Sequence, residues 1–377
     1  MVRIGIVAGE ASGDLLGSHL IQALKQKHTD IEFIGIAGPK MISAGAKSLF
    51  PMERLSVRGY VEVIKHLYGL LKLRKQLLNY FLDNPPDLFI GIDAPDFNFW
   101  LEKKLKRNGI KAIHYVGPSI WAWRKNRIHD IKKSVNHILA LFPFEVSIYQ
   151  EANIPVTYVG HPLADILPME PDTGGARETL KLNPDSLVIA MLPGSRQGEV
   201  RQHAQLFVQT IKIIHASHPE AQFLVPLITR ETRKIFEAAI FSEPQPLPIQ
   251  ILFGHAHDAM EAADVVIVAS GTATLEAALL KKPMVITYRM SKLSWQILKR
   301  MHLQPYVGLP NILAEKFVVP ELLQDECTPE KLAEATLKLV SDTSYLDEIK
   351  NEFTKIHLSL RQNTAEKAAQ AVLEYLR

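Results

Sequence analysis

Leu192-Pro193-Gly194-Ser195-Arg196-Gln197-Gly198-Glu199 stands between an apolar strand, expected over Leu187–Leu192, and a helix expected over Gln202–Ser217. Gly9-Glu10-Ala11-Ser12-Gly13-Asp14 follows the first expected strand of the chain in the same way, and both stretches read G-x-x-x-G-acid. Neither stretch is G-x-G-x-x-G or a Walker loop, which disfavours a dinucleotide dehydrogenase and a P-loop NTPase. The same pattern after the first strand of each half predicts two Rossmann-like domains that face each other over a cleft.

Short apolar runs alternate with helical patterns along the chain. Runs that are apolar on both faces are typical of parallel strands covered by helices on both sides, so the sequence predicts an α/β fold. The expected strands are Arg3–Ala8, Ile31–Ala37, Leu88–Ile92, Lys111–Val116, His137–Leu141, Val156–Val159, Leu187–Leu192, Gln222–Leu227, Ile249–Phe253, Val265–Ala269 and Pro283–Tyr288. The expected helices include Leu15–Lys27, Ile64–Leu82, Phe97–Arg107, Gln202–Ser217 and Thr274–Lys281.

The chain has 377 residues, and domains of roughly 150 residues make two the natural number. The Pro- and Gly-rich stretch Leu167–Gly175 is the expected boundary, which gives domains over 1–167 and 168–344. The remaining residues, 345–377, end in a helix with Ala and Val side chains on one face. We expect that helix to pack, either on the first domain or on another subunit.

Charge and cysteine content restrict the class of protein. The 43 Lys and Arg against 40 Asp and Glu leave a net charge of +3, which argues against nucleic-acid binding through overall charge. Cys327 is the single cysteine, so a reducing compartment is the simplest interpretation. We find neither a signal peptide nor an uncharged apolar run of membrane-spanning length. We therefore expect a cytoplasmic protein whose membrane contact, if any, is superficial.

Two turns of the second domain are suited to an anion. Gly194 and Ser195 let the backbone approach a ligand and Arg196 can hold a phosphate with two donors, although an ordinary glycine turn would look the same. Ser270, Gly271 and Thr272 follow the strand Val265–Ala269 at the edge where α/β proteins bind ligands. Glu276 could accept hydrogen bonds from ribose hydroxyls. Alternatively, Ser270 or Thr272 caps the helix with Glu276 as capping-box partner.

In the first domain, Gly91-Ile92-Asp93-Ala94-Pro95-Asp96-Phe97-Asn98 ends a buried strand with two carboxylates. Asp93 is placed at the carboxyl edge of the sheet, where it could take a proton from an attacking hydroxyl. Asp96 is expected to cap the next helix. His255 and His257 could ligate zinc but have no third clustered ligand, so we predict no metal. Trp121–Arg127 mixes aromatic and basic residues and fits base stacking, a substrate rim or plain packing.

The expected helix Val63–Leu82 contains no acidic residue and is amphipathic. Its apolar face opposes Lys65, Lys72, Gln76 and Asn79, with Arg74 as an exception on the apolar side. Such a helix suits the surface of an anionic membrane, or it is an ordinary core helix. On the membrane interpretation, the lipid contacts are Ile64, Leu67, Leu70 and Leu71.

Five blocks, in this order, resemble the lipid-A-disaccharide synthase family: VAGEASGD (7–14), GIDAPDFN (91–98), SIWAWR (119–124), LPGSR (192–196) and LPN (309–311). The resemblance implies an inverting glycosyltransferase of GT-B architecture that needs neither metal nor cofactor. It implies UDP-2,3-diacylglucosamine as donor, 2,3-diacylglucosamine 1-phosphate (lipid X) as acceptor, and a peripheral position on the cytoplasmic face of the inner membrane. This favours the membrane interpretation of Val63–Leu82. Whether the protein is a homodimer stays open.

The resemblance also implies a role for each candidate site residue. Asp93 would deprotonate the acceptor 6-hydroxyl, while Arg196 and the N–H groups near Gly194 and Ser195 would stabilise the departing UDP. Ser270, Gly271 and Thr272 would hold the diphosphate and Glu276 the ribose. The resemblance assigns Glu10, Ser12 and Asn311 to substrate binding. The alternatives are a UDP-sugar epimerase, a transferase with a soluble acceptor, and a non-catalytic nucleotide-sugar-binding protein.

Overall fold

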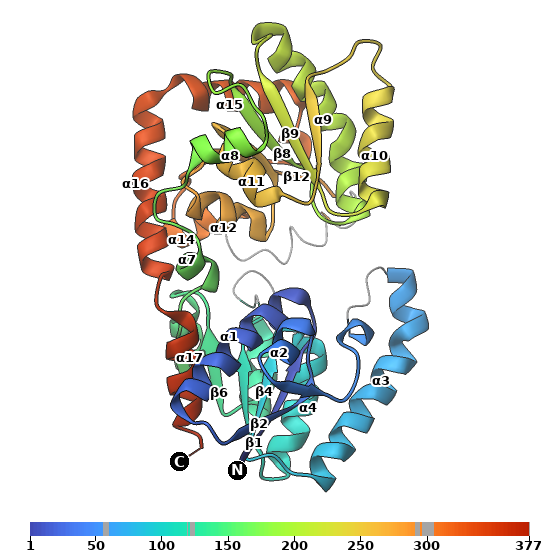
Figure 1. The fold of residues 1–377 in the computed structure, drawn as a ribbon, viewed down its shortest axis with the longest axis vertical. Coiled ribbons are helices and arrows are strands. Elements are labelled where there is room, and N and C mark those ends of the chain that lie inside the picture. The colour runs from blue at the N-terminus through green and yellow to red at the C-terminus, as the bar shows by residue number, and fades with distance from the viewer. Residues whose placement is uncertain (56–59, 119, 121–124, 291–294, 296–304, 377) are drawn as a thin grey trace. The chain divides into compact units, whose positions relative to one another are not determined.

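Two parallel sheets organise the chain (Figure 1). The computed structural model describes residues 1–55, 60–118, 120, 125–290, 295 and 305–376, and the side chains of residues 60–67 and 125 lie outside that description. Contacts divide the chain into a first unit, Met1–Asp165 with Leu360–Arg377, and a second unit, Ile166–Ser359.

The sheet of the first unit has the strand order β3-β2-β1-β4-β5-β6-β7. Its strands β1 and β4 pair in register from Ile4 with Leu88 to Ala8 with Ile92, and both are almost wholly buried because helices cover the two faces. The strands are β1 (Val2–Ala8), β2 (Ile31–Ile36), β3 (Ala46–Ser48), β4 (Leu88–Ile92), β5 (Lys111–Tyr115), β6 (His137–Ala140) and β7 (Val156–Tyr158). The helices are α1 (Ala11–Lys27), α2 (Pro39–Ser43), α3 (Tyr60–Asp83), α4 (Pro95–Arg107), α5 (Ile128–Ser134), α6 (Glu145–Glu151) and α7 (Pro162–Ile166), the last reaching into the second unit.

The sheet of the second unit has the order β10-β9-β8-β11-β12-β13. Its strands are β8 (Val188–Leu192), β9 (Gln222–Leu227), β10 (Ile249–Phe253), β11 (Val265–Ala269), β12 (Met284–Tyr288) and β13 (Glu321–Leu323). Its helices are α8 (Thr173–Thr179), α9 (Gln197–Ser217), α10 (Arg230–Phe241), α11 (Ala256–Ala262), α12 (Thr272–Leu279), α14 (Leu309–Ala314), α15 (Pro329–Ser341) and α16 (Thr343–Leu360).

All eleven predicted strands are present, each within one residue of its predicted ends. The prediction missed β3 and β13, which are three residues long and lie at the edges of their sheets. A strand this short has no room for a periodic pattern, and Lys47 and Ser48 of β3 are exposed.

The end of the chain returns to the first unit. Helix α17 (Thr364–Leu373) lies against α1 (Figure 1). Ala368, Ala369 and Val372 are fully buried in the core of that unit, and Lys27 forms an ion pair with Glu366. The predicted packing helix is therefore present and docks on its own first unit. Residues 345–359, which we grouped with this helix, belong to the second unit.

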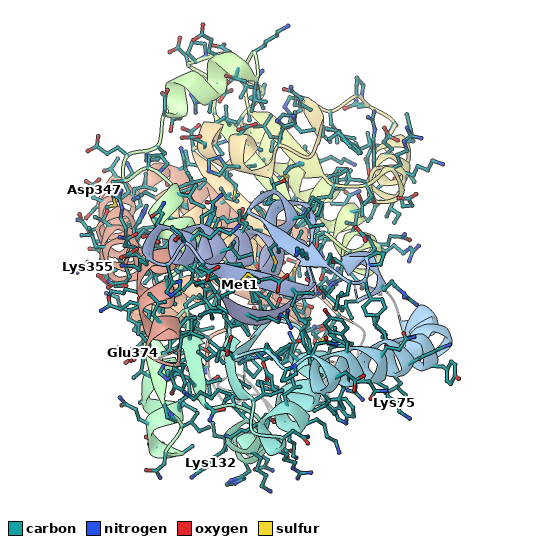
Figure 2. All side chains as sticks on the ribbon, turned by 60° about the horizontal axis from the view of Figure 1, so that its bottom comes forward. Met1, Lys75, Lys132, Asp347, Lys355 and Glu374 are labelled. Atoms are coloured by element: carbon teal, nitrogen blue, oxygen red, sulfur yellow. The ribbon has the colours of Figure 1, made fainter. Side chains whose placement is uncertain are left out.

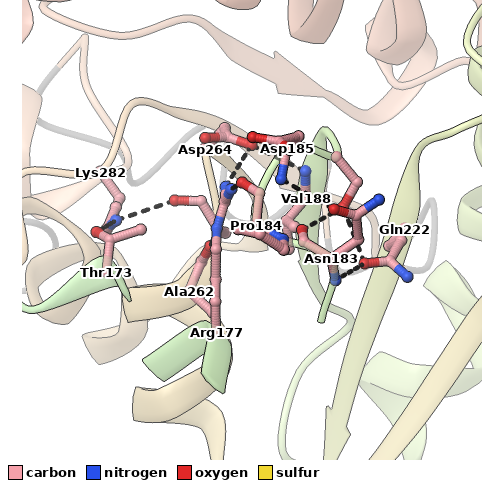
Figure 3. A network of polar contacts seen from close by, with 12 residues as sticks. Thr173, Arg177, Asn183, Pro184, Asp185, Val188, Gln222, Ala262, Asp264 and Lys282 are labelled. Carbon is pink, nitrogen blue, oxygen red and sulfur yellow. Dashed lines mark hydrogen bonds and ion pairs between the residues drawn. The ribbon is translucent and has the colours of Figure 1, made fainter. Parts of the chain in front are cut away.

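Helix α8 begins inside the stretch that we expected to be an irregular boundary. Asp172 caps it by accepting the Gly175 N–H at 2.9 Å. Arg177 then reaches the Ala262 carbonyl and the Asp264 carboxylate, and Lys282 donates to Thr173 Oγ1 at 2.7 Å (Figure 3). Burial lowers the pKa of Lys282 to about 8. Hydrogen bonds and an ion pair therefore attach this stretch to the second unit. Apolar periodicity in the sequence does not reveal a helix that is held in this way.

No helix among the described residues is long and apolar enough to cross a membrane.

Candidate functional site

The first candidate site lies where β1 and β4 end side by side. From β1 the chain adds β2 and β3 on one side of the sheet and then β4 to β7 on the other, so the strand order reverses between β1 and β4. Such a switch point, at the carboxyl edge of a parallel sheet, is where α/β folds bind ligands. The two loops touch there, because a Cβ on Gly9 would lie 2.6 Å from the Cβ of Ala94. Glycine at position 9 is thus required for the loop that carries Glu10 to approach the loop that carries Asp93.

Asp93 stands on a strained turn. Asp93 and Ala94 both adopt left-handed backbone angles, with φ of 52° and 44°, which residues with a side chain rarely adopt. Asn98 holds this turn from the inside, since its buried amide Nδ2 donates to the Asp93 carbonyl at 2.8 Å. The Asp93 N–H donates to the Tyr115 carbonyl at 2.9 Å. The carboxylate itself is half-buried.

A buried acid–base pair lies behind the turn and was not predicted. Glu102 of α4 and His114 of β5 are both completely buried, with 2.7 Å between Oε1 and Nδ1. A Cβ on Gly91 would lie 2.2 Å from the Glu102 Oε1. Burial raises the pKa of the Glu102 carboxyl, and His114 opposes that shift.

Three polar atoms of this cluster, Asn98 Oδ1, Glu102 Oε2 and His114 Nε2, are buried without a hydrogen-bond partner among the described residues. Buried polar groups that lack a partner are uncommon in folded proteins and mark a region as a functional candidate. The sequence signal was the i, i+4 spacing of Asn98 and Glu102 on the inner face of an expected helix, followed by a histidine inside an expected strand.

Glu10 and Ser12 lie at the same edge of the first sheet. Glu10 occupies the N-cap position of α1 without a side-chain capping bond, and Ser12 is in the first turn. Both are exposed, whereas Asp14 is buried and accepts the N–H groups of Lys40 and Met41, each at 3.0 Å. Asp14 of the G-x-x-x-G-acid pattern is therefore a cap for α2.

The capping role that we expected for Asp96 is wrong. Ala94 is the N-cap of α4, and Asp96 sits in the first helical turn, where it forms an ion pair with Arg127. The two left-handed residues before Pro95 turn the chain one step earlier than the pattern suggested. Residues 121–124 of the aromatic and basic cluster lie outside the described residues.

In the second unit, the loop after β8 is held by Glu199. Its Oε2 accepts the N–H groups of Ser195 at 3.0 Å and Arg196 at 3.1 Å, and its Oε1 lies 3.5 Å from Arg196 Nη1. Two of the N–H groups that we expected to face a ligand, those of Ser195 and Arg196, are thus bonded to the carboxylate of Glu199. Gly194, with φ of 111°, has no room for a Cβ, which would lie 2.6 Å from the Glu199 Cβ. The Arg196 side chain is 81% exposed and remains accessible.

The loop after β11 lies beside it at the same edge, because β8 and β11 are paired neighbours. Gly271 is the N-cap of α12 and no side chain caps the helix, so the capping roles considered for Ser270, Thr272 and Glu276 do not occur. Ser270 Oγ donates to the Val307 carbonyl at 3.4 Å. Burial raises the pKa of Glu276, and nearby His257 opposes that shift.

Asn311 lies behind this edge and is completely buried. Its Nδ2 donates to the Val319 carbonyl and to Glu321 Oε1, and its Oδ1 accepts the N–H groups of Val318 and Val319. These four bonds use all the hydrogen-bonding capacity of the amide. Glu321 in turn accepts the N–H groups of Val307 and Gly308 at 2.9 Å, which fixes the segment that contacts Ser270. Asn311 is thus built into the framework.

The histidines considered for zinc are paired with acids instead. His255 Nδ1 lies 2.7 Å from Asp258, and His257 lies 3.7 Å from Glu261. No group of three candidate metal ligands gathers among the residues that the structure describes.

Comparison with known proteins identifies close relatives over the full chain. The family described as "Lipid-A-disaccharide synthetase" matches residues 4–375. The lipid-A-disaccharide synthase of Methylobacillus flagellatus is 66% identical over 378 residues and covers 100% of both chains. That of Dechloromonas aromatica is 58% identical over 377 residues and covers 100% of this chain and 99% of its own.

Solved structures resemble the chain in fold. UDP-GlcNAc 2-epimerase of Neisseria meningitidis, bound to UDP-GlcNAc, gives a TM-score of 0.63 at 14% identity and covers 100% of this chain and 99% of its own. The calicheamicin glycosyltransferase CalG4 gives 0.61 at 15% identity, with coverage of 100% and 98%. At such identities the likeness shows the fold alone, and it confirms the predicted α/β architecture of GT-B type. The epimerase alternative gains no further support from it.

Proposed function

The chain belongs to the lipid-A-disaccharide synthase family, and we propose that Asp93 is the general base of its glycosyl transfer. The reaction joins 2,3-diacylglucosamine from UDP-2,3-diacylglucosamine to lipid X and releases UDP. The assignment of this activity rests on the 66% identity to a lipid-A-disaccharide synthase over the full chain. The strained, half-buried position of Asp93 at the switch point supports its role.

In the proposed step, Asp93 accepts the proton of the acceptor 6-hydroxyl as its oxygen attacks the anomeric carbon of the donor. The bond from that carbon to the β-phosphate oxygen breaks, and its electron pair leaves with UDP. A positioned carboxylate contributes about 10²–10⁴ to such a rate. The Asn98 amide holds the turn through its bond to the Asp93 carbonyl, and we expect the Glu102–His114 pair to support it from behind. A base that is already in place spares the reaction the cost of ordering it.

Negative charge grows on the diphosphate as it leaves, and cationic and N–H donors stabilise it. We assign the exposed guanidinium of Arg196 and the N–H group of Thr272, at the start of α12, to this task. Ser270 lies at the same edge. Glu276, one turn into α12, is assigned to the ribose. The N–H group of Ser195 is bonded to Glu199 and shapes the loop rather than meeting the phosphate.

We further propose that the first half of α3 contacts the membrane from which both acylated substrates come. Tyr68 is 77% exposed and Leu71 is 45% exposed. Large apolar side chains that stay exposed together can mark a surface that contacts a membrane or a partner. Lys72 and Lys75, which follow within about one helical turn, are exposed, and Figure 2 shows Lys75 on α3. Leu70 is half-buried, and the side chains of Ile64 and Leu67 lie outside the described residues. The arrangement suits a peripheral position on an anionic leaflet, such as the cytoplasmic face of the inner membrane.

The direct test of the activity is UDP release from UDP-2,3-diacylglucosamine by the purified protein, with and without lipid X. Release that requires lipid X, together with a tetraacyl disaccharide 1-phosphate product, supports the synthase. Release without lipid X, or interconversion of the donor sugar, would instead favour hydrolysis or epimerisation.

A further inference from the structure

Arg289 lies at the carboxyl edge of the second unit's sheet, the edge to which we assign the diphosphate. It follows β12, which pairs with β11 from Val266 with Met284 to Ala269 with Thr287. The Ser270 N–H donates to the Thr287 carbonyl at 3.0 Å. Because the strands are parallel, the residues after Ala269 and after Tyr288 emerge at the same edge, so Arg289 and Ser270 are neighbours in the fold.

His203 fixes the backbone of Arg289. The imidazole is completely buried in α9, and both of its nitrogens lie within hydrogen-bond distance of backbone groups. Its Nδ1 lies 2.8 Å from the Glu199 carbonyl, so Nδ1 carries the proton. Its Nε2 is therefore the acceptor of the Arg289 N–H at 3.1 Å. This neutral tautomer links the first turn of α9, which holds the Arg196 loop, to the position of Arg289.

The surroundings of His203 keep it in that neutral form. Burial lowers its pKa most, the carbonyl and charge of Glu199 oppose that shift, and the positive charge of Arg289 lowers the pKa further. The carbonyl of Pro193 also faces it, and the rings of Phe207 and Tyr288 pack against it. The lowered pKa favours the neutral imidazole, whose Nε2 accepts the Arg289 N–H.

The Arg289 guanidinium has no acidic partner among the residues that the structure describes. The nearest titratable groups feel its charge: it helps to lower the pKa of His203 and opposes the rise that burial causes in the pKa of Cys327. Arg196, by contrast, shares its charge with Glu199 at 3.5 Å. A diphosphate bears more charge than one shared guanidinium can balance, and an unpaired, half-buried arginine is a strong phosphate donor.

We infer that Arg289 is a second cation that binds the diphosphate of the nucleotide sugar, and that His203 is the residue that positions it. The inference rests on the proposed nucleotide site in the second unit. The ligand class is a nucleoside diphosphate, and Arg289 contacts its phosphate oxygens rather than its base.

The test compares UDP with uridine, which has no phosphate. By calorimetry, Arg289→Ala should weaken UDP binding at least tenfold and Arg289→Lys less, while uridine affinity, measured by ligand-observed NMR, stays within twofold. His203→Phe removes the acceptor and should weaken UDP binding several-fold. His203→Gln keeps an acceptor and should restore most of it. Arg233→Ala, which removes an exposed arginine of α10 paired with Glu237, is the matched control and should change neither affinity.

Two results overturn the inference. One is unchanged UDP affinity in Arg289→Ala while Arg196→Ala weakens UDP binding, which would leave the nucleotide site standing without Arg289. The other is an equal loss of UDP and uridine affinity, which would mean that Arg289 only supports the fold. If neither arginine variant affected UDP, the proposed nucleotide site would itself be wrong and the inference would fall with it.

Discussion

At the scale of single residues, Gly91 shows how closely the site is packed. Its missing side chain makes room for Glu102 Oε1 at 2.2 Å and Asn98 Cβ at 2.9 Å from where a Cβ would stand. Its own backbone conformation is ordinary, so space and not flexibility requires the glycine. The residue therefore controls how near α4 comes to β4, two positions before Asp93.

Gly91→Ala should lower the free energy of unfolding by about 1–3 kcal/mol, because the added methyl group overpacks a rigid core. It should also lower turnover by shifting the Asp93 turn. Thermal unfolding and the UDP-release assay measure the two effects. Gly69→Ala in α3 is the control, since a Cβ there meets nothing within 4 Å and alanine favours a helix. A Gly91→Ala protein as stable and active as wild type would contradict the packing argument.

Sequence patterns located Asp93 and Arg196 just after strand ends and Glu276 one turn into the following helix, because strand ends follow from local apolar runs. They did not predict the left-handed turn at Asp93, the Glu102–His114 pair or the bonding of Asn311. Each of these depends on which elements become neighbours in the folded unit, and no local pattern contains that information. The same reason explains why the N–H groups of Ser195 and Arg196 seemed free, although Glu199 takes them four and three residues later.

At the scale of elements, α3 divides into two halves along its length. Leu73, Leu77 and Phe81 are buried in the core of the first unit, so this part of the predicted apolar face is an ordinary core face. Arg74, the exception in the pattern, stacks on Trp100 with 4.2 Å from its guanidinium carbon to the ring centroid. Among the described side chains of α3, the exposed large apolar ones are Tyr68 and Leu71, on neighbouring turns, and Leu82 near the end of the helix.

The double variant Tyr68→Ser, Leu71→Ser should bind anionic vesicles several-fold more weakly than wild type in a sedimentation assay, while keeping its unfolding temperature. The reason is the loss of apolar area that would enter the acyl boundary. Phe241→Ser, which removes a side chain 83% exposed on α10, is the matched control. Equal vesicle binding by all three proteins would argue against a membrane role for α3.

Helix α4 and strand β5 are joined by the Glu102–His114 pair, and we predict that this link serves Asp93. Glu102→Leu should reduce the turnover number by about 10–100-fold with UDP affinity unchanged, since a misplaced base loses rate steeply. Glu102→Gln keeps a hydrogen bond to His114 and should recover most of the rate. Leu105→Ala, a buried change on the same helix, should lower stability yet spare the turnover number. If Glu102→Leu lowered the stability but left the turnover number unchanged, the Glu102–His114 pair would have only a structural role.

At the scale of the whole molecule, the pH dependence of stability should carry the signature of Glu145. This buried carboxyl accepts the Phe142 N–H at 3.1 Å, yet burial raises its pKa to about 8. Between the unfolded pKa of 4.5 and about 8, the folded protein holds a proton that the unfolded chain has lost. Stability therefore falls as pH rises through this window, by at most about 1.4 kcal/mol per pH unit from this group.

Glu145→Gln removes that titration. The variant should gain stability relative to wild type as pH rises from 5 to 8.5, measured by chemical denaturation at each pH. The difference should level off above pH 8.5, where Glu145 is ionised in both states. Stability curves that run parallel over this range would show that Glu145 does not stay protonated in the fold.

The central claim is that Asp93 removes the acceptor proton while the second unit holds the nucleotide. The most direct measurement is the turnover of Asp93→Asn in acceptor-dependent UDP release, together with its affinity for UDP by calorimetry. We predict turnover lower by about 10²–10⁴ with UDP affinity within twofold of wild type, because the amide keeps the shape of the side chain and cannot accept the proton. Turnover close to that of wild type would contradict the account and remove Asp93 from the mechanism.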